Sequence, residues 1–128
     1  MSAESAEELL ERAKLGEAEA QFKLAQVYNY GLGTAIDEDT ALEWYRRAAN
    51  QQFEHAQFTL GEICKEGRIT PQDLIQAHVW YSLVVSAKGA LAAAGAEGCA
   101  EIEPYMSPAQ IADAKQLAQS WSPEGVTA

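Results

Sequence analysis

The sequence is poor in the residues that build metal centres and disulfide frameworks. It has two cysteines and two histidines in 128 residues, and none of them stands at a Cys-x-x-Cys or His-x-x-x-His spacing. With no framework to complete, Cys64 and Cys99 are expected to be free thiols in a reducing compartment. The sequence therefore predicts no metal site, and it favours a cytoplasmic protein.

Positive charge is also scarce. Nine Lys and Arg stand against nineteen Asp and Glu, which gives a formal net charge of −10. The excess of acid is even, with ten acids and five bases in residues 1–53 and nine acids and four bases in residues 54–128. Because neither half has a basic region for phosphates, we expect no nucleic-acid partner and no binding to anionic membranes.

Long apolar runs are absent as well. No stretch reaches eighteen apolar residues, and the opening segment MSAESAEELLERAKLG has neither the basic nor the apolar part of a secretory signal. We therefore expect no membrane insertion; no secretory signal is visible, and a leader that has already been removed is the alternative. The remaining composition, 48% hydrophobic and 22% charged, is typical of one soluble globular domain.

What the sequence does contain is an internal repeat. The segment ALEWYRRAA begins at Ala41, and AHVWYSLVV begins 36 residues later at Ala77. When residues 20–45 are compared with residues 56–81 without gaps, ten positions are identical. Average composition would give roughly two identities over such a window. The pattern therefore predicts two copies of one structural unit.

Each copy has the pattern of an antiparallel helix pair. In the first copy, apolar residues three and four apart predict a helix over 17–30, which Gly31 can end in the left-handed conformation. Asp37 can then accept the first free amides of a second helix, which buries Trp44 and Tyr45. The second copy predicts two more helices, near 53–66 and 73–88. One pair cannot bury its apolar face alone, so we expect the pairs to stack.

The same period continues more weakly in both directions. Upstream, SAEELLERAKLG has the pattern of the second helix of a truncated unit. Downstream, residues 89–100 contain six Ala and three Gly, which predicts either a linker or, in the favoured interpretation, a helix that packs closely against its neighbour. The small residues expected at that contact are Ala92, Gly95, Ala96 and Cys99.

A last helix has a clear start, because Ser107, Pro108 and Gln110 have the pattern of a capping box. Apolar residues then follow at helical spacing up to Trp121. The predicted fold class is all-α, a right-handed α-solenoid of stacked antiparallel helix pairs with about seven helices. The expected parts of this single domain are a capping helix in 1–15, repeats in 16–51 and 52–88, a degenerate third unit with a closing helix in 89–121, and a tail in 122–128.

The two copies resemble the Sel-one-like repeat (SLR), a relative of the tetratricopeptide repeat. The resemblance rests on the pattern AxxGxxxAQFxLAxxYxxGLG…D…ALxWYRRAA, and it covers residues 13–121. Gln52 and Ile69 depart from the pattern, because they stand where the first copy has Gly16 and Gly33. The closing segment YMSPAQIADAKQLAQSW is similar to the helix that follows the last repeat in bacterial members.

The resemblance implies a scaffold that brings proteins together, with no shared catalytic residue. Cysteine-rich secreted relatives imply an alternative, a small-molecule-binding protein or a β-lactam-type hydrolase, but this chain lacks their cysteine pairs. No Gly-rich phosphate loop, serine elbow or pair of carboxylates on one helix face stands out either. We expect no enzyme and no cofactor, and a cluster of His55, His78 and Cys64 is the less favoured alternative to ordinary packing histidines.

The repeated aromatic and glutamine positions have two interpretations. Trp44, Tyr45, Trp80 and Tyr81 either pack between helices or form hot spots for a ligand, and their fixed place in the repeat favours packing. The glutamines expected to bond across a helix junction are Gln21 and Gln57.

The predicted function is a non-catalytic protein–protein interaction scaffold or adaptor, for example one that neutralises a toxin. We expect a monomer or weak homo-oligomer that binds another protein or a peptide on a concave face built by the first helix of each unit. The side chains that remain on those helices once packing positions are removed are Lys23, Gln26, Tyr30, Thr59, Glu62 and Glu66. Their mixed charge suits a peptide's charge pattern, and ordinary solvated helix faces are the alternative.

Overall fold

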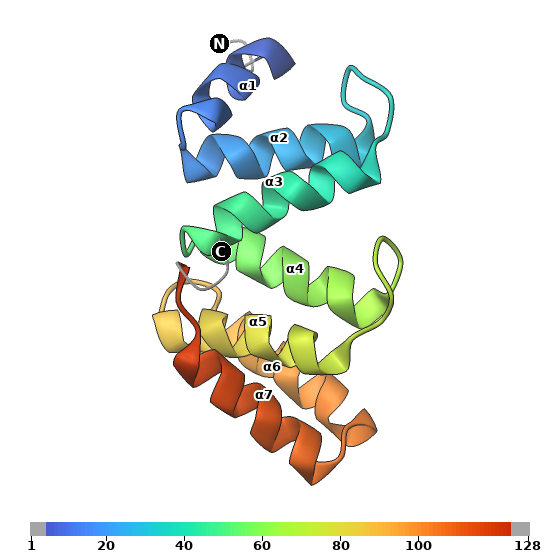
Figure 1. The fold of residues 1–128 in the computed structure, drawn as a ribbon, viewed down its shortest axis with the longest axis vertical. Helices are drawn as coiled ribbons and strands as arrows, with labels where there is room; N and C mark the ends of the chain where they lie inside the picture. Colours follow the sequence, from blue (N-terminus) through green and yellow to red (C-terminus); the bar gives the residue numbers. More distant parts are fainter. Residues whose placement is uncertain (1–4, 124–128) are drawn as a thin grey trace.

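The computed structural model describes residues 5–123, and every regular element in that part of the chain is helical (Figure 1). The predicted N-terminal cap and C-terminal tail extend beyond the described residues. The elements are α1 (Ala6–Lys14), α2 (Ala18–Tyr30), α3 (Glu38–Asn50), α4 (Glu54–Glu66), α5 (Leu74–Ala87), α6 (Ala92–Ile102), the short 3-10 turn η1 (Glu103–Tyr105) and α7 (Pro108–Ser120). Each helix from α1 to α6 packs against the next one, and α7 packs against α5, which confirms the expected all-α solenoid of stacked helices.

The N-terminal caps are those that the sequence predicts. Asp37 and Asp73 each accept the backbone N–H three residues further on, so the second helix of each repeat begins in the same way. Ser107 and Gln110 form the expected capping box at the start of α7. Because these bonds satisfy amides that the helix itself leaves free, they place each helix start at a fixed residue.

The first helix of each repeat ends at a glycine in the left-handed conformation, with φ of 66° at Gly31 and 69° at Gly67. Beyond the first glycine, the N–H of Asp37 donates to the carbonyl oxygen of Tyr28 at 2.9 Å, and the equivalent bond 36 residues later has the same length. Both loops therefore close in the same way, and both lie on one side of the stack in Figure 1.

The repeated aromatic residues lie in the core. Trp44 and Trp80 are 8% and 6% exposed, and Tyr45 and Tyr81 are still more deeply buried. This burial confirms the packing interpretation. Cys64, which stands where the first copy has a tyrosine, is buried as the sequence predicts.

Residues 89–100 are mostly helical and pack against α5, so the linker alternative is wrong. The contact face also differs from the expected one. Gly95 and Gly98 are buried, while Ala96 is exposed. A side chain at position 98 would lie 2.7 Å from the ring of Tyr81, and one at position 95 would lie 2.9 Å from the carbonyl oxygen of Tyr81, so the helix presents these two glycines to α5.

The closing helix α7 buries less of its apolar stripe than the sequence predicts. Ala114 is buried against the core, but Leu117 is 49% exposed. Trp121 lies just beyond the last helical residue, and its ring meets that of Trp80 edge-on with 6.1 Å between centroids. Within the described residues, the end of the stack is thus closed by an aromatic pair as well as by the helix.

Candidate functional site

Two of the three side chains predicted on α2 are well exposed. Tyr30, the last residue of the helix, has 62% of its surface exposed, and Lys23 is exposed as well, while Gln26 is half-buried. Lys23 Nζ lies 3.9 Å from Glu19 Oε1, one turn earlier. An exposed ion pair of this kind contributes little to stability, so Lys23 can exchange Glu19 for another partner.

The three side chains predicted on α4 differ more in exposure. Thr59 is half-buried, and its hydroxyl donates to the carbonyl oxygen of His55 at 2.7 Å. Glu62 is also half-buried, with its Oε2 2.8 Å from Lys65 Nζ. Glu66 ends the helix and is exposed, which makes it the most accessible of the three.

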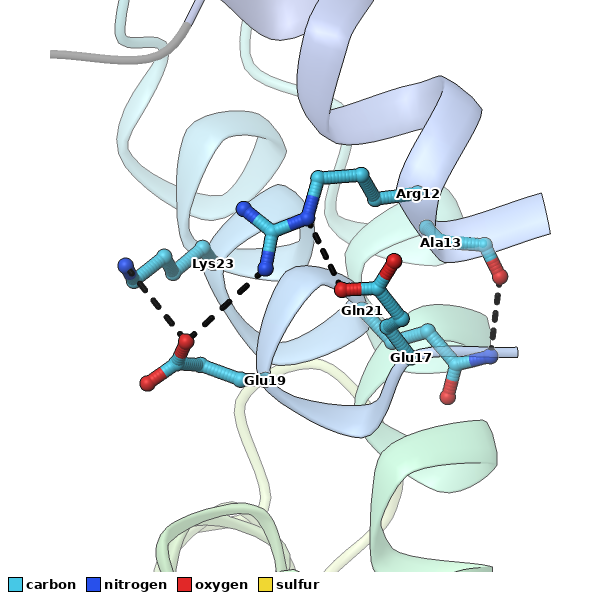
Figure 2. A network of polar contacts seen from close by, with 6 residues as sticks. All are labelled: Arg12, Ala13, Glu17, Glu19, Gln21 and Lys23. Atoms are coloured by element: carbon cyan, nitrogen blue, oxygen red, sulfur yellow. Dashed lines mark hydrogen bonds and ion pairs between the residues drawn. The ribbon is translucent and has the colours of Figure 1, made fainter. Parts of the chain in front are cut away.

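A polar network joins α1 to the start of α2 beside Lys23 (Figure 2). Arg12 Nε donates to Glu17 Oε1 at 2.9 Å, and Arg12 Nη2 lies 4.0 Å from Glu19 Oε1. Glu19 is therefore shared between Arg12 and Lys23 (Figure 2). The network connects a residue of the predicted binding face to the N-terminal helix.

The two repeat glutamines hold helix junctions together, as predicted. Gln21 Nε2 donates to the carbonyl oxygen of Ala13 at 3.1 Å (Figure 2), and Gln57 Nε2 donates to that of Ala49 at 3.3 Å. Both glutamines are buried. Because the two bonds are 36 residues apart, they show that α1 occupies the place of a repeat's second helix.

A chain of polar side chains between α5, α6 and η1 was not anticipated from the sequence. His78 is 1% exposed, with Nε2 2.8 Å from Glu103 Oε2 and Nδ1 3.1 Å from Ser82 Oγ. Cys99 Sγ lies 3.9 Å from the same hydroxyl. These four side chains line one wall of a cavity of ≈ 340 Å³.

Glu103, His78 and Ser82 are connected in the order of a catalytic triad, but their surroundings differ from those of a catalytic serine. Ser82 lies inside α5, where the backbone N–H groups bond within the helix rather than face a substrate oxygen. Burial raises the pKa of the Cys99 thiol, so at neutral pH it is protonated and a poor nucleophile. The contact of His78 with Glu103 instead joins η1 to α5, and the contact with Ser82 lies within α5.

The alternative cluster of His55, His78 and Cys64 does not form. The ring of His55 packs against Phe22 and Phe53, with centroids 5.9 and 5.8 Å apart. Across residues 5–123, no three His, Cys, Asp or Glu side chains gather as a metal-binding group. No helix in the same part of the chain has the length and apolar character needed to cross a membrane.

A second cavity, of ≈ 490 Å³, lies where α4 and α6 end and α5 begins. Its walls are formed by Lys65, Gln72, Leu74, Glu101, Ile102 and Tyr105. Sequence reasoning missed this cavity. Its far wall comes from α6 and η1, whose orientation the repeat pattern does not predict.

Comparison with known proteins identifies two repeats in this chain. Residues 18–53 and 54–83 match the family model of the Sel1 repeat. The fold is similar to that of a protective antigen of uropathogenic Escherichia coli displaying an SLR fold, with a TM-score of 0.81 and 29% identity over 95% of this chain and 27% of that one. A Sel1 repeat protein from Oxalobacter formigenes gives a TM-score of 0.62 and 26% identity over 69% of this chain and 35% of that one.

Sequence similarity also extends to a fungal protein. The chitin synthase regulator SKT5 of Malassezia restricta is 37% identical over 75 residues, which are 57% of this chain and 5% of that protein. This chain thus spans a small part of SKT5 and about a third or less of each solved structure. The two Sel1 matches together cover half of the chain and coincide with the 36-residue period, so the chain belongs to the Sel1 repeat family.

Proposed function

We propose that this chain is a non-catalytic scaffold or adaptor that binds another protein, or a peptide segment of one, on the concave face of its stack. Sel1 repeats are protein-interaction repeats, and the stacked pairs supply the extended surface that such proteins use. The name of the related SKT5 protein describes a regulator, which agrees with an adaptor role.

The observation that carries the proposal is the contrast between packing and surface positions in the two repeats. Three packing positions of α2 keep the same residue in α4, as in Leu24 and Leu60, and the other packing positions stay small or apolar. The accessible positions on the same helices change in character, from Tyr30 to Glu66 for example. A scaffold that retains its core and varies one face is suited to recognising an asymmetric partner.

The six side chains of the proposed surface are repeat equivalents in three pairs. They are Lys23 with Thr59, Gln26 with Glu62, and Tyr30 with Glu66. An exposed tyrosine on α2 supplies a large contact area, and two carboxylates on α4 favour a partner segment with positive charge. With the proposed repeat divisions at 16–51 and 52–88, three of the six side chains belong to each unit.

The proposal includes the protein's setting. Both cysteines are free thiols, which suits a reducing, cytoplasmic compartment. The net charge of −10 disfavours nucleic acid as a partner and keeps copies of the chain apart, so we propose that it acts as a monomer or weak homo-oligomer.

The test is charge reversal on α4. The full chain is immobilised, partners are captured from native lysate and identified, and the captured protein is then purified and titrated against variants. Glu62→Lys combined with Glu66→Lys is expected to weaken binding at least about tenfold, because two carboxylates that attract the partner become repulsive. The circular-dichroism melt is expected to change little, since both side chains are at least partly exposed.

Glu7→Lys combined with Glu11→Lys is the matched control. Both residues are exposed on α1, and the pair changes the net charge by the same amount. If the partner binds the Glu62 and Glu66 variant as tightly as the wild type, and added salt has no effect, the surface is wrongly placed. Equal weakening in both double variants would mean that only total charge matters.

A further inference from the structure

The cavity between α4, α5 and α6 combines an apolar floor with an exposed aromatic ring. Leu74 is half-buried and Ile102 is 2% exposed, so both present apolar surface without leaving the core. Tyr105 is 80% exposed although it is a large aromatic residue. An aromatic ring left in solvent at the edge of a hollow is a common anchor for a bound side chain.

The charge around this cavity is strongly acidic. The bordering segments 62–66, 72–74 and 101–105 contain five acids and one base. That base, Lys65, is already engaged, because its Nζ lies 2.8 Å from Glu62 Oε2 and 3.5 Å from Glu101 Oε2. The hydrogen bond to Glu62 is the main reason that the pKa of Lys65 is raised, so the ammonium is fully charged and neutralises only part of the acid.

Glu101 is the carboxylate among the described residues that line the cavity. Its side chain is 63% exposed, and its contact with Lys65 is longer than the one that Glu62 makes. A carboxylate has about four acceptor positions on its two oxygens. Glu101 can therefore keep Lys65 and still accept two parallel hydrogen bonds from a planar cation.

We propose that this cavity is an arginine pocket, in which an arginine of a bound peptide stacks on Tyr105 and donates to Glu101. The methylene stem of the arginine then lies over Leu74 and Ile102 at the floor of the cavity. The volume of ≈ 490 Å³ also leaves room for part of a neighbouring apolar side chain of the peptide. The inference rests on the proposed function, since it assigns the chemistry of one segment of the partner.

Arginine fits these walls better than lysine for two physical reasons. Its guanidinium is planar, so it can lie flat on the ring of Tyr105 and donate two bonds to one carboxylate at the same time. A lysine ammonium is a compact, strongly hydrated charge that gains less from either contact. The pocket is therefore expected to distinguish the two residues even though their charge is equal.

The experiment uses the ¹⁵N-labelled full chain and three blocked tripeptides, acetyl-Leu-Xaa-Leu-amide, in which Xaa is arginine, lysine or citrulline. The arginine peptide is expected to shift the backbone amide signals of residues 72–74 and 101–105 at concentrations up to about 10 mM. The lysine peptide is expected to bind at least about fivefold more weakly. Citrulline has nearly the shape of arginine without its charge, so its peptide is expected to leave those signals in place.

Variants then assign the contacts. Glu101→Gln and Tyr105→Ala are each expected to weaken the arginine peptide at least about fivefold. The matched controls are Glu97→Gln, an exposed acid on the same helix, and Leu32→Ala, an exposed apolar residue in the loop after α2, and both are expected to bind the arginine peptide as the wild type does. Equal shifts with citrulline, or no arginine-dependent shift at the highest concentration, overturn the proposal.

The experiments can refute the concave binding surface and the arginine pocket independently of each other. If the captured partner loses affinity when Glu62 and Glu66 are reversed, but the tripeptides do not distinguish arginine from citrulline, the scaffold function stands and the arginine pocket is wrong. If the arginine peptide binds at residues 101–105 while partner capture survives the reversal, the pocket stands and the concave surface is wrong.

Discussion

Gln57 donates a side-chain hydrogen bond to the carbonyl oxygen of Ala49, across the junction where α3 turns into α4. The side chain is 3% exposed, so the bond is made away from water. Gln21 makes the same bond to Ala13 one repeat earlier. Each of these carbonyl oxygens also accepts a backbone N–H, from Gln52 for Ala49 and from Gly16 for Ala13, so the glutamine of the next helix is a second partner.

Replacing Gln57 with leucine removes that partner while keeping the volume of the side chain nearly constant. We expect Gln57→Leu to lower the free energy of unfolding by about 0.5–1.5 kcal/mol, because the carbonyl oxygen of Ala49 loses the bond from Gln57 but keeps the one from the N–H of Gln52. Urea denaturation followed by circular dichroism measures the change. Gln119→Leu, at an exposed position on α7, is the control and is expected to have little effect. Equal midpoints for the two variants would show that the bond contributes nothing.

Trp80 is expected to hold the stack together rather than to bind a ligand. It is 6% exposed and its ring meets that of Trp121, so Trp80→Ala creates a cavity in the core. The expected loss is about 3–5 kcal/mol in the free energy of unfolding, and Trp44→Ala is expected to cost a similar amount. Trp121→Ala, at a less buried ring, is expected to cost less. A stably folded Trp80→Ala variant that only loses partner affinity would instead place Trp80 in the binding surface.

Local signals made much of this fold predictable. The 36-residue period, the aspartate caps and the left-handed glycines each act within a few residues, so they can be read without knowing how helices pack. The rotation of α6 could not be predicted in this way. The sequence pattern places Gly95 and Ala96 at the contact, but Tyr81 selects the face with Gly95 and Gly98, because its carbonyl oxygen faces Gly95 and its ring faces Gly98.

The same limit applies to the candidate sites. The six residues of the proposed surface follow from helical spacing within α2 and α4. The contacts of Lys65 with Glu101 and of His78 with Glu103 join residues 36 and 25 positions apart. The members of each pair lie on different elements, so helical spacing does not indicate either contact. Only the folded structure shows these contacts. The cavity proposed for arginine was missed for this reason.

The close approach of α6 to α5 gives a prediction in which packing opposes helix propensity. Alanine is favoured over glycine inside a helix by about 1 kcal/mol. A side chain at position 98 would nevertheless lie 2.7 Å from the ring of Tyr81, which is fully buried and also packed against Gly61. We therefore expect Gly98→Ala to lower the free energy of unfolding by about 1–3 kcal/mol, as in other overpacked cores.

Ala96→Gly supplies the comparison, because position 96 is exposed on the same helix and reports propensity alone. It is expected to cost about 1 kcal/mol. Thermal and urea unfolding of the two variants measures both effects. If Gly98→Ala raises the stability by the amount that Ala96→Gly lowers it, the ring of Tyr81 does not select the face of α6.

The last prediction concerns the buried thiol of Cys64. Burial raises the pKa of Cys64 to about 11, whereas an unfolded cysteine titrates near about 8.5. The folded state therefore holds this proton more tightly than the unfolded state. The resulting stabilisation is present below about pH 8.5 and is lost as the pH rises through the folded value near 11. Other groups titrate in the same range, so the quantity to measure is the difference in unfolding free energy between the wild type and Cys64→Ala as a function of pH.

We expect that difference to shift against the wild type as the pH rises above about 8.5, because the alanine variant has no thiol to ionise. Thiol counting under denaturing, non-reducing conditions should also find both cysteines, since both are free in the fold. In the Cys99→Ala background, native Cys64 is expected to react with iodoacetamide much more slowly than the unfolded chain does at the same pH, because little thiolate is present. Parallel pH profiles for the wild type and Cys64→Ala, together with rapid native alkylation, would contradict a thiol whose ionisation is suppressed by burial.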